Sequence, residues 1–275
     1  MKNYLDFRDE IRGLVDVSET VRVVDQIAAS QIHKLRLEVD SLETYSNHVE
    51  NIIQRLDSFD IKTNIKQNEK DDNKILVIIG GDKGLVGGLW NLIVTKIKGN
   101  YSKIYVYGNK MREILEEKQI AFDRYFDQLN NQGDTNKDEL ANFVMTGIAD
   151  GAFSVVDILY PKYISLAEQT ANLHNFYPFK TIKLQDSTEP IGYPIFNPDP
   201  NAFFNSIRTK YFRTKILKII TESRLSELSA RTVSMEEAGV KTKKKIKAAR
   251  MKFNKERRSF QTQMQLESFV SHINI

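Results

Sequence analysis

The residues best placed to do chemistry form a glycine-rich loop, GGDKGLVGG, at 80–88. The β-branched run KILVII precedes this loop and the helix-like segment LWNLIVTKI follows it. Loops that bind nucleotide phosphates occupy the same place between a strand and a helix. The spacing of the glycines therefore decides whether a nucleotide site is expected.

Neither of the two common phosphate-binding patterns fits the loop. A Walker loop ends in Gly-Lys-Ser/Thr, whereas Gly88 is followed by Leu89 and Trp90. The dinucleotide fingerprint needs Gly-x-Gly-x-x-Gly and an acidic residue at the end of the second strand. Here the inner glycines are spaced by three residues, and the second strand ends in Tyr-Gly-Asn at 107–109. The spacing favours tight backbone packing over nucleotide binding.

The remaining reactive residue types form no recognisable site. The chain has no cysteine, which removes disulfides, thiolate metal ligands and cysteine nucleophiles together. The histidines are scattered without metal-ligand spacing, at His33, His48, His174 and His272. We therefore expect no catalytic residue, no cofactor and no metal site.

Positive charge is concentrated in one segment near the C-terminus. The formal net charge is only +4. The segment 241–258, called the basic belt below, carries Glu256 as its only acidic residue and ten basic residues: Lys241, Lys243, Lys244, Lys245, Lys247, Arg250, Lys252, Lys255, Arg257 and Arg258. Such a belt fits an acidic protein partner, a solvated helix face, or a nucleic acid held by phosphate contacts.

The composition predicts a cytoplasmic protein. No run approaches the roughly 18 apolar residues that span a bilayer, so we expect no direct membrane insertion. The first residues, MKNYLDFRDEIRG, are too acidic for a signal peptide. The lack of cysteine agrees with a reducing compartment.

The distribution of helix-breaking residues divides the chain into three parts. Neither Gly nor Pro occurs between Gly13 and Gly80, and Gly239 is the only one after Pro200. Because both residues destabilise helix interiors, we predict long helices at 1–66 and 201–275 that flank a central domain at 67–200.

Both predicted helices carry an apolar repeat with an average spacing of 3.5 residues, which is typical of coiled coils. The predicted seam of the first is Leu14, Val17, Val21, Val24, Ala28, Gln31, Leu35, Glu38, Leu42, Tyr45, Val49, Ile52 and Leu56. A weaker seam in the second runs from Phe204 to Val270. Periodicity alone leaves open an antiparallel hairpin within one chain, a homodimeric coiled coil or a helical bundle.

The central part alternates predicted strands with predicted helices. Strands are expected at 74–79, at 103–108 and at 153–161, where the last ends at Pro161. Helices are expected after the loop, near 110–119, and at 138–150. This order predicts an open, Rossmann-like α/β sheet.

Five segments in this order resemble the gamma subunit of F-type rotary ATP synthases. They are VRVVDQIAASQIHKLR, GGDKGLVGGLWN, NPDPNAFFNSIRTKYFRTKI, SRLSELSARTVSMEEA and FNKERRSFQTQMQLESFV. The resemblance covers nearly the whole chain. It implies a central α/β foot domain flanked by two terminal helices that form an antiparallel coiled coil.

The resemblance also implies a function and partners. A gamma subunit is the non-catalytic central-stalk rotor, whose hairpin stands inside a hexamer of alternating alpha and beta subunits. Its foot contacts an epsilon-type subunit and the membrane ring, so the chain would lie peripherally at the inner face of the cell membrane. A paralogous rotor that drives a load other than protons is an alternative, and a nucleic-acid-binding coiled-coil protein is an alternative of another class.

The site residues follow from residue-level resemblance. Contacts with the catalytic subunits are assigned to Arg22, Val24, Gln26, Arg257, Arg258, Thr262 and Gln263. A bearing at the end of the last helix is assigned to Leu266, Phe269 and Val270. Apolar contacts suit a bearing because they are non-directional.

Overall fold

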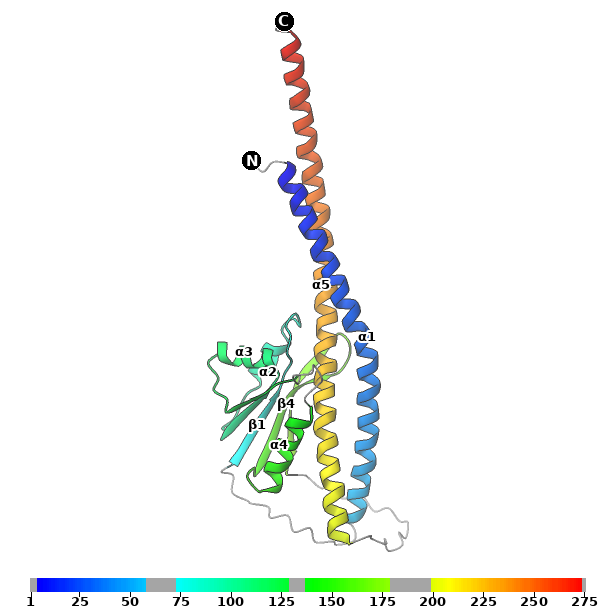
Figure 1. The fold of residues 1–275 in the computed structure, drawn as a ribbon, viewed down its shortest axis with the longest axis vertical. Helices are drawn as coiled ribbons and strands as arrows, with labels where there is room; N and C mark the ends of the chain where they lie inside the picture. The colour runs from blue at the N-terminus through cyan, green and yellow to red at the C-terminus, as the bar shows by residue number, and fades with distance from the viewer. Residues whose placement is uncertain (1–3, 58–72, 129–136, 179–198, 274–275) are drawn as a thin grey trace. The chain divides into compact units, whose positions relative to one another are not determined.

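The structure is a computed structural model that describes residues 4–57, 73–128, 137–178 and 199–273. Its ten elements follow the colour ramp of Figure 1. They are α1 (Tyr4–Asp57), β1 (Lys74–Ile79), α2 (Leu89–Thr95), β2 (Lys103–Tyr107), α3 (Asn109–Glu117), β3 (Arg124–Phe126), α4 (Lys137–Ala149), β4 (Val155–Tyr163), β5 (Gln169–Tyr177) and α5 (Pro200–Ile273). The two long terminal helices and the alternating central elements confirm the predicted fold class.

The chain divides into two compact units. The first unit is Met1–Ser30 with Arg231–Ile275, and the second is Gln31–Ala230. Both α1 and α5 begin in one unit and end in the other.

A five-stranded sheet in the order β3-β2-β1-β4-β5 forms the centre of the second unit. The first four strands are parallel and β5 is antiparallel to β4. The sequence analysis did not predict β3 or β5. The strand predicted at 153–161 corresponds to β4. The prediction ended it at Pro161, whereas β4 continues to Tyr163. Pairing with β1 stops at Leu159, so the missing N–H of Pro161 removes no hydrogen bond on that side.

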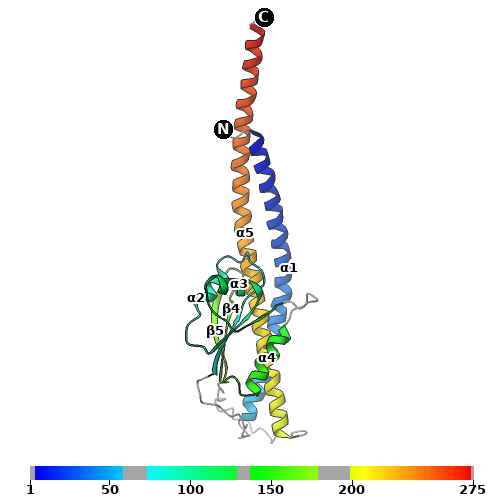
Figure 2. The same cartoon turned by 60° about the vertical axis from the view of Figure 1, so that its left-hand side comes forward.

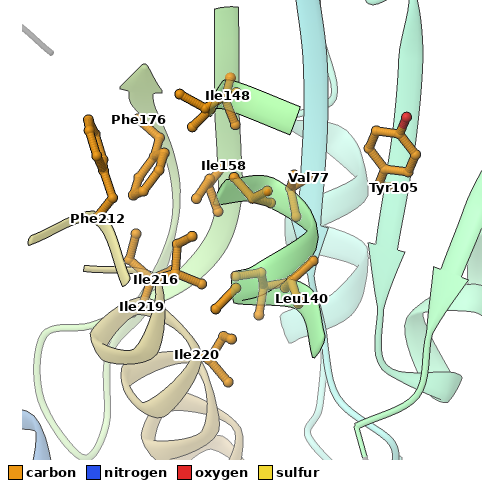
Figure 3. Close-up of a cluster of buried hydrophobic side chains, with 14 of the residues drawn as sticks. Val77, Tyr105, Leu140, Ile148, Ile158, Phe176, Phe212, Ile216, Ile219 and Ile220 are labelled. Carbon is orange, nitrogen blue, oxygen red and sulfur yellow. The ribbon is translucent and has the colours of Figure 1, made fainter. Parts of the chain in front are cut away.

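Each face of the sheet packs against helices. On one face, Val77 and Ile158 pack with Leu140 of α4 and with Ile216 and Ile220 of α5 (Figure 3). On the other face, α2 and α3 cover the sheet with Trp90, Ile93, Met111 and Leu115. Figure 2 shows α4 beside α5 in this unit.

In each unit, α1 and α5 lie antiparallel. In the second unit, the Thr221 hydroxyl lies 3.4 Å from Glu38, the Lys218 ammonium 2.9 Å from Glu43, and the Tyr211 hydroxyl 3.2 Å from Glu50. Residue numbers therefore fall along α5 as they rise along α1. In the first unit, Tyr4 contacts the rings of Phe253 and Phe260, while Val21 lies beside Gly239. The hairpin is formed within one chain.

The seam of α1 differs in phase from the prediction at Val17, Gln31, Tyr45 and Ile52, whereas Val24 and Glu38 are half-buried as predicted and the side chain of Leu56 lies outside the described residues. Val17, Tyr45 and Ile52 are exposed, and the shielded positions are the next residues, Ser18, Ser46 and Ile53. Because Ser18, Asp25 and Ser46 are polar, a search for apolar spacing passes over them. The predicted seam of α5 is correct from Ile207 to Glu256, and Phe260 and the later described seam positions are exposed.

Candidate functional site on the helical hairpin

The first unit is a helical hairpin with small side chains in its seam. Ala28 of α1 and Thr242 and Ala249 of α5 are buried, and Met235 is the one large apolar residue of α5 in this unit that is buried among the described residues. A Cβ added at Gly239 would lie 3.8 Å from Val21 Cγ1. Small residues let the two helices approach closely, and they leave the longer polar side chains pointing outward.

The basic belt faces solvent. Every Lys and Arg of the belt is exposed, whereas Thr242, Ile246, Ala249 and Phe253 between them are buried or half-buried. Lys241 forms an ion pair with Glu237 at 3.3 Å, one turn earlier on the same helix. The belt therefore presents concentrated positive charge on the outside of α5, where an acidic partner could bind it.

The structure places the predicted contact residues in two separate groups. Arg22 and Gln26 are exposed on α1, and Val24 beside them is half-buried. Arg257, Arg258, Thr262 and Gln263 are exposed on α5. Since Tyr4 contacts Phe260, the α5 group lies level with the start of α1. A helix rises 1.5 Å per residue, so Arg22 lies about 27 Å further along the hairpin.

The end of α5 is a single exposed helix within the part of the chain that the structure describes. All residues from Arg257 to Val270 are exposed. The predicted bearing residues Leu266, Phe269 and Val270 are 60%, 69% and 57% exposed. Phe260 and Met264 are also apolar and are 45% and 52% exposed. The sequence analysis did not assign them to the bearing. Several exposed apolar residues on one short helical segment mark an interaction surface.

Only the first two glycines of the loop pack tightly in the second unit; an added Cβ would lie 3.9 Å from Lys110 at Gly84 and would meet nothing within 4 Å at Gly87 or Gly88. A Cβ on Gly80 would overlap Met111, and one on Gly81 would lie 2.5 Å from Glu227 Oε2 and 2.6 Å from Trp90 Cζ2. Gly108 has a φ of 102°, and a Cβ there would lie 2.9 Å from the Gly81 nitrogen. Glu227 of α5 therefore lies at the carboxyl end of β1, where doubly wound sheets commonly bind ligands.

One carboxyl group of this loop is held by the backbone. Asp82 Oδ1 accepts a 2.8 Å hydrogen bond from the Asn109 N–H. Burial raises the pKa of Asp82 above its usual range, although this hydrogen bond and the nearby Arg224 oppose the rise. The carboxylate thus has a structural role in joining the loop to the start of α3.

A family model described as ATP synthase matches residues 3–264. This match runs through the hairpin, the glycine loop and the sheet. The chain belongs to the ATP synthase gamma-chain family. The family relationship covers nearly the whole length, so it includes both units.

Individual members of the family are distant from this chain. The ATP synthase gamma chain of Protochlamydia amoebophila is 22% identical over an alignment of 281 positions, which covers 97% of each chain. That of Ruminococcus albus is 23% identical and covers 100% of this chain and 99% of its own.

Solved central stalks have the same fold. A chain in the cryo-EM structure of the Euglena gracilis mitochondrial ATP synthase, OSCP/F1/c-ring in rotational state 3, has a TM-score of 0.70 and 16% identity. The match covers 98% of this chain and 93% of that one. A chain of the Tetrahymena thermophila mitochondrial central stalk and c-ring has a TM-score of 0.57, covering 80% and 99%. Among the described residues, no helix is long and apolar enough to cross a membrane.

Proposed function

We propose that this chain is the non-catalytic central-stalk rotor of an F-type ATP synthase. It couples rotation to ATP synthesis or hydrolysis at sites on the alpha and beta subunits. The observation that carries this proposal is the family match over residues 3–264, which includes the hairpin and the sheet in one chain. The chain itself performs no bond chemistry.

The hairpin acts through contacts that differ around its circumference. The basic belt presents its charge on α5, while the exposed face of α1 around Arg22 and Gln26 is only partly basic. A partner subunit therefore meets a different surface when the hairpin turns. A rotor can shift the conformation of a catalytic subunit only by such differential contact.

The two groups of contact residues have different roles. Arg22, Val24 and Gln26 contact the catalytic subunits from α1, and Arg257, Arg258, Thr262 and Gln263 contact them from the exposed C-terminal part of α5. Leu266, Phe269 and Val270 form the bearing, because exposed apolar side chains can slide in an apolar collar without register-locking hydrogen bonds. Acidic loops of the catalytic subunits attract the basic belt.

The central part of the chain, 67–200, is the foot of the stalk. It binds an epsilon-type subunit and the membrane ring, and the flanking segments 1–66 and 201–275 are the coiled-coil helices. The boundary between residues 66 and 67 lies outside the described residues. The chain acts in the cytoplasm, held peripherally at the inner face of the membrane by its complex.

Coexpression with alpha and beta subunits tests this proposal. The full chain copurifies with both subunits, and removal of 257–275 uncouples ATP hydrolysis from ion transport while the chain still folds. A matched control removes only the residues beyond Val270. Recovery of the full chain as a homodimer without these subunits would refute the proposal. Tight, salt-sensitive binding to DNA would favour a nucleic-acid-binding protein instead.

A further inference from the structure

Three consecutive charged residues begin α4, and together they contact three other elements of the second unit. Lys137 contacts α1 and α5, Asp138 contacts α5, and Glu139 contacts β3. Consecutive residues of a helix point in directions about 100° apart, so one turn can reach several neighbours. The first turn of α4 is thus connected by polar contacts to both long helices and to the sheet.

Lys137 makes the most shielded of these contacts. Its ammonium donates to Glu38 Oε1 at 2.8 Å and to Thr221 Oγ1 at 3.1 Å. The Lys137 side chain is 19% exposed, and Thr221 is fully buried. The Thr221 hydroxyl in turn donates to the Leu217 carbonyl at 2.9 Å. This hydrogen bond orients the hydroxyl so that its oxygen can accept from Lys137. One side chain therefore joins α4 to both helices of the hairpin.

The two neighbouring carboxylates extend this connection. Asp138 Oδ1 accepts from Arg213 of α5 at 2.6 Å, and Glu139 Oε1 accepts from Arg124 of β3 at 3.4 Å. Both carboxylates lie at the N-terminus of α4, where the helix dipole favours negative charge. These two ion pairs are exposed, so Lys137 is the residue whose loss matters most.

We propose that the first turn of α4 is a joint that transmits torque between the sheet and the hairpin helices, with Lys137 as its principal positioning residue. This inference rests on the proposed rotor function. A second polar connection runs directly from α5 to the sheet, where Glu222 is hydrogen-bonded to the Tyr160 side chain and to the Tyr163 backbone of β4. Many of the remaining contacts are apolar, among them Leu140 and Ile220 in the same core. Apolar contacts resist separation but are non-directional, whereas charge-assisted hydrogen bonds depend on geometry and oppose sliding and rotation.

The test compares two substitutions of the same type. Lys137→Met removes the ammonium but keeps the length of the side chain. Lys110→Met is the control, because among the described residues the Lys110 ammonium pairs at 2.6 Å with Glu113 on the same helix, α3, and with no other helix or strand. Thr221→Val is a second variant, which removes only the accepting hydroxyl and keeps the shape of the side chain.

The readout is the torsional stiffness of the assembled complex. The full chain is bound to an immobilised hexamer of alpha and beta subunits, and a rod is attached at Lys118→Cys, an exposed residue at the end of α3. Without ATP, the variance of the rod angle is inversely proportional to stiffness. Loss of one charge-assisted hydrogen-bonded contact in Lys137→Met raises this variance, while Lys110→Met leaves it unchanged.

Amide hydrogen exchange on the isolated full chain provides an independent readout. Lys137→Met speeds exchange in the first turn of α4 and around 217–221 of α5, and Lys110→Met does not. Equal variance of the rod angle, or equal amide exchange, in Lys137→Met and Lys110→Met would contradict the proposal that the first turn of α4 is a joint. Failure of the unmodified chain to bind the hexamer would instead overturn the rotor function, and exchange would then decide the joint alone. If Lys137→Met does not fold, Thr221→Val decides in the same two measurements.

Discussion

At the scale of single residues, Gly13 and Gly81 occupy opposite environments. Gly13 lies in α1 with no atom within 4 Å of an added Cβ, whereas a Cβ on Gly81 would meet Glu227 and Trp90. The glycine spacing predicted tight packing of this loop. In the structure, Gly81 packs against Trp90 of α2 and Glu227 of α5. The identity of that neighbour could not be predicted, because 146 positions separate Gly81 from Glu227 (227 − 81).

We therefore expect alanine to have opposite effects at these two glycines. Gly81→Ala lowers the free energy of unfolding by about 1–3 kcal/mol because it overpacks a filled site. Gly13→Ala raises it by about 1 kcal/mol, because alanine is the better helix former in open space. Chemical denaturation of both variants measures the difference. Equal effects of the two substitutions would contradict the packing role of the loop.

A single histidine gives the second unit a predictable response to pH. Burial lowers the pKa of His174 below its usual 6.5, and the nearby Lys215 and Lys218 add to this effect, while Asp157 opposes it. Below pH 6.5, His174 is protonated in the unfolded chain but stays neutral in the folded chain. The free energy of unfolding therefore falls as the pH falls toward the lowered pKa of His174.

His174→Gln removes this contribution and flattens the dependence of unfolding free energy on pH below 6.5. The control is His48→Gln, which changes an exposed histidine on α1. Denaturation curves across this pH range measure both slopes. The same slope in His174→Gln and in the unmodified chain would show that the histidine does not cause it.

At the scale of elements, the phase of the coiled-coil seam separates what sequence could and could not predict. The strand 74–79 was predicted with its correct bounds, and the helix 138–150 within one residue at each end. The strand β3 has only three residues, and β5 carries polar residues on both faces, so neither gave a clear alternating pattern. In α1, two apolar repeats offset by one residue fit the sequence. The repeat that packs against α5 includes the polar residues Ser18, Asp25 and Ser46, so a search for apolar residues misses it.

Two adjacent isoleucines of α1 test the seam directly. Ile53 is 4% exposed and Ile52 is 40% exposed. We expect Ile53→Ala to destabilise the chain by about 2–5 kcal/mol, because it leaves a cavity in the core. Ile52→Ala has a much smaller effect. A larger decrease in the free energy of unfolding for Ile52→Ala than for Ile53→Ala would instead support the seam that the sequence analysis predicted.

At the scale of the whole molecule, the sequence left the pairing of the two long helices open, and the structure resolves it. A homodimer and an intrachain hairpin have the same periodicity, because the spacing of apolar residues does not record which chain supplies the partner helix. The contact residues were assigned by resemblance alone. Their spacing along the hairpin followed only from the pairing of Tyr4 with Phe253 and Phe260.

Paired cysteines distinguish the hairpin from a homodimer. Val21 and Gly239 face each other in the first unit, and the chain has no native cysteine. The double variant with cysteine at both positions forms a disulfide within one chain and runs as a monomer on a non-reducing gel. Each single variant is the control and remains uncrosslinked. A crosslinked dimer from the double variant would contradict the hairpin.

Rotation of a single complex tests the central claim most directly. The hexamer is immobilised through its beta subunits, and the rod on Lys118→Cys reports the angle of the chain. The account predicts that ATP drives this rod in one direction and that removal of 257–275 weakens the drive. A rod that stays at one angle while the same complexes hydrolyse ATP would contradict the assignment of this chain as the rotor.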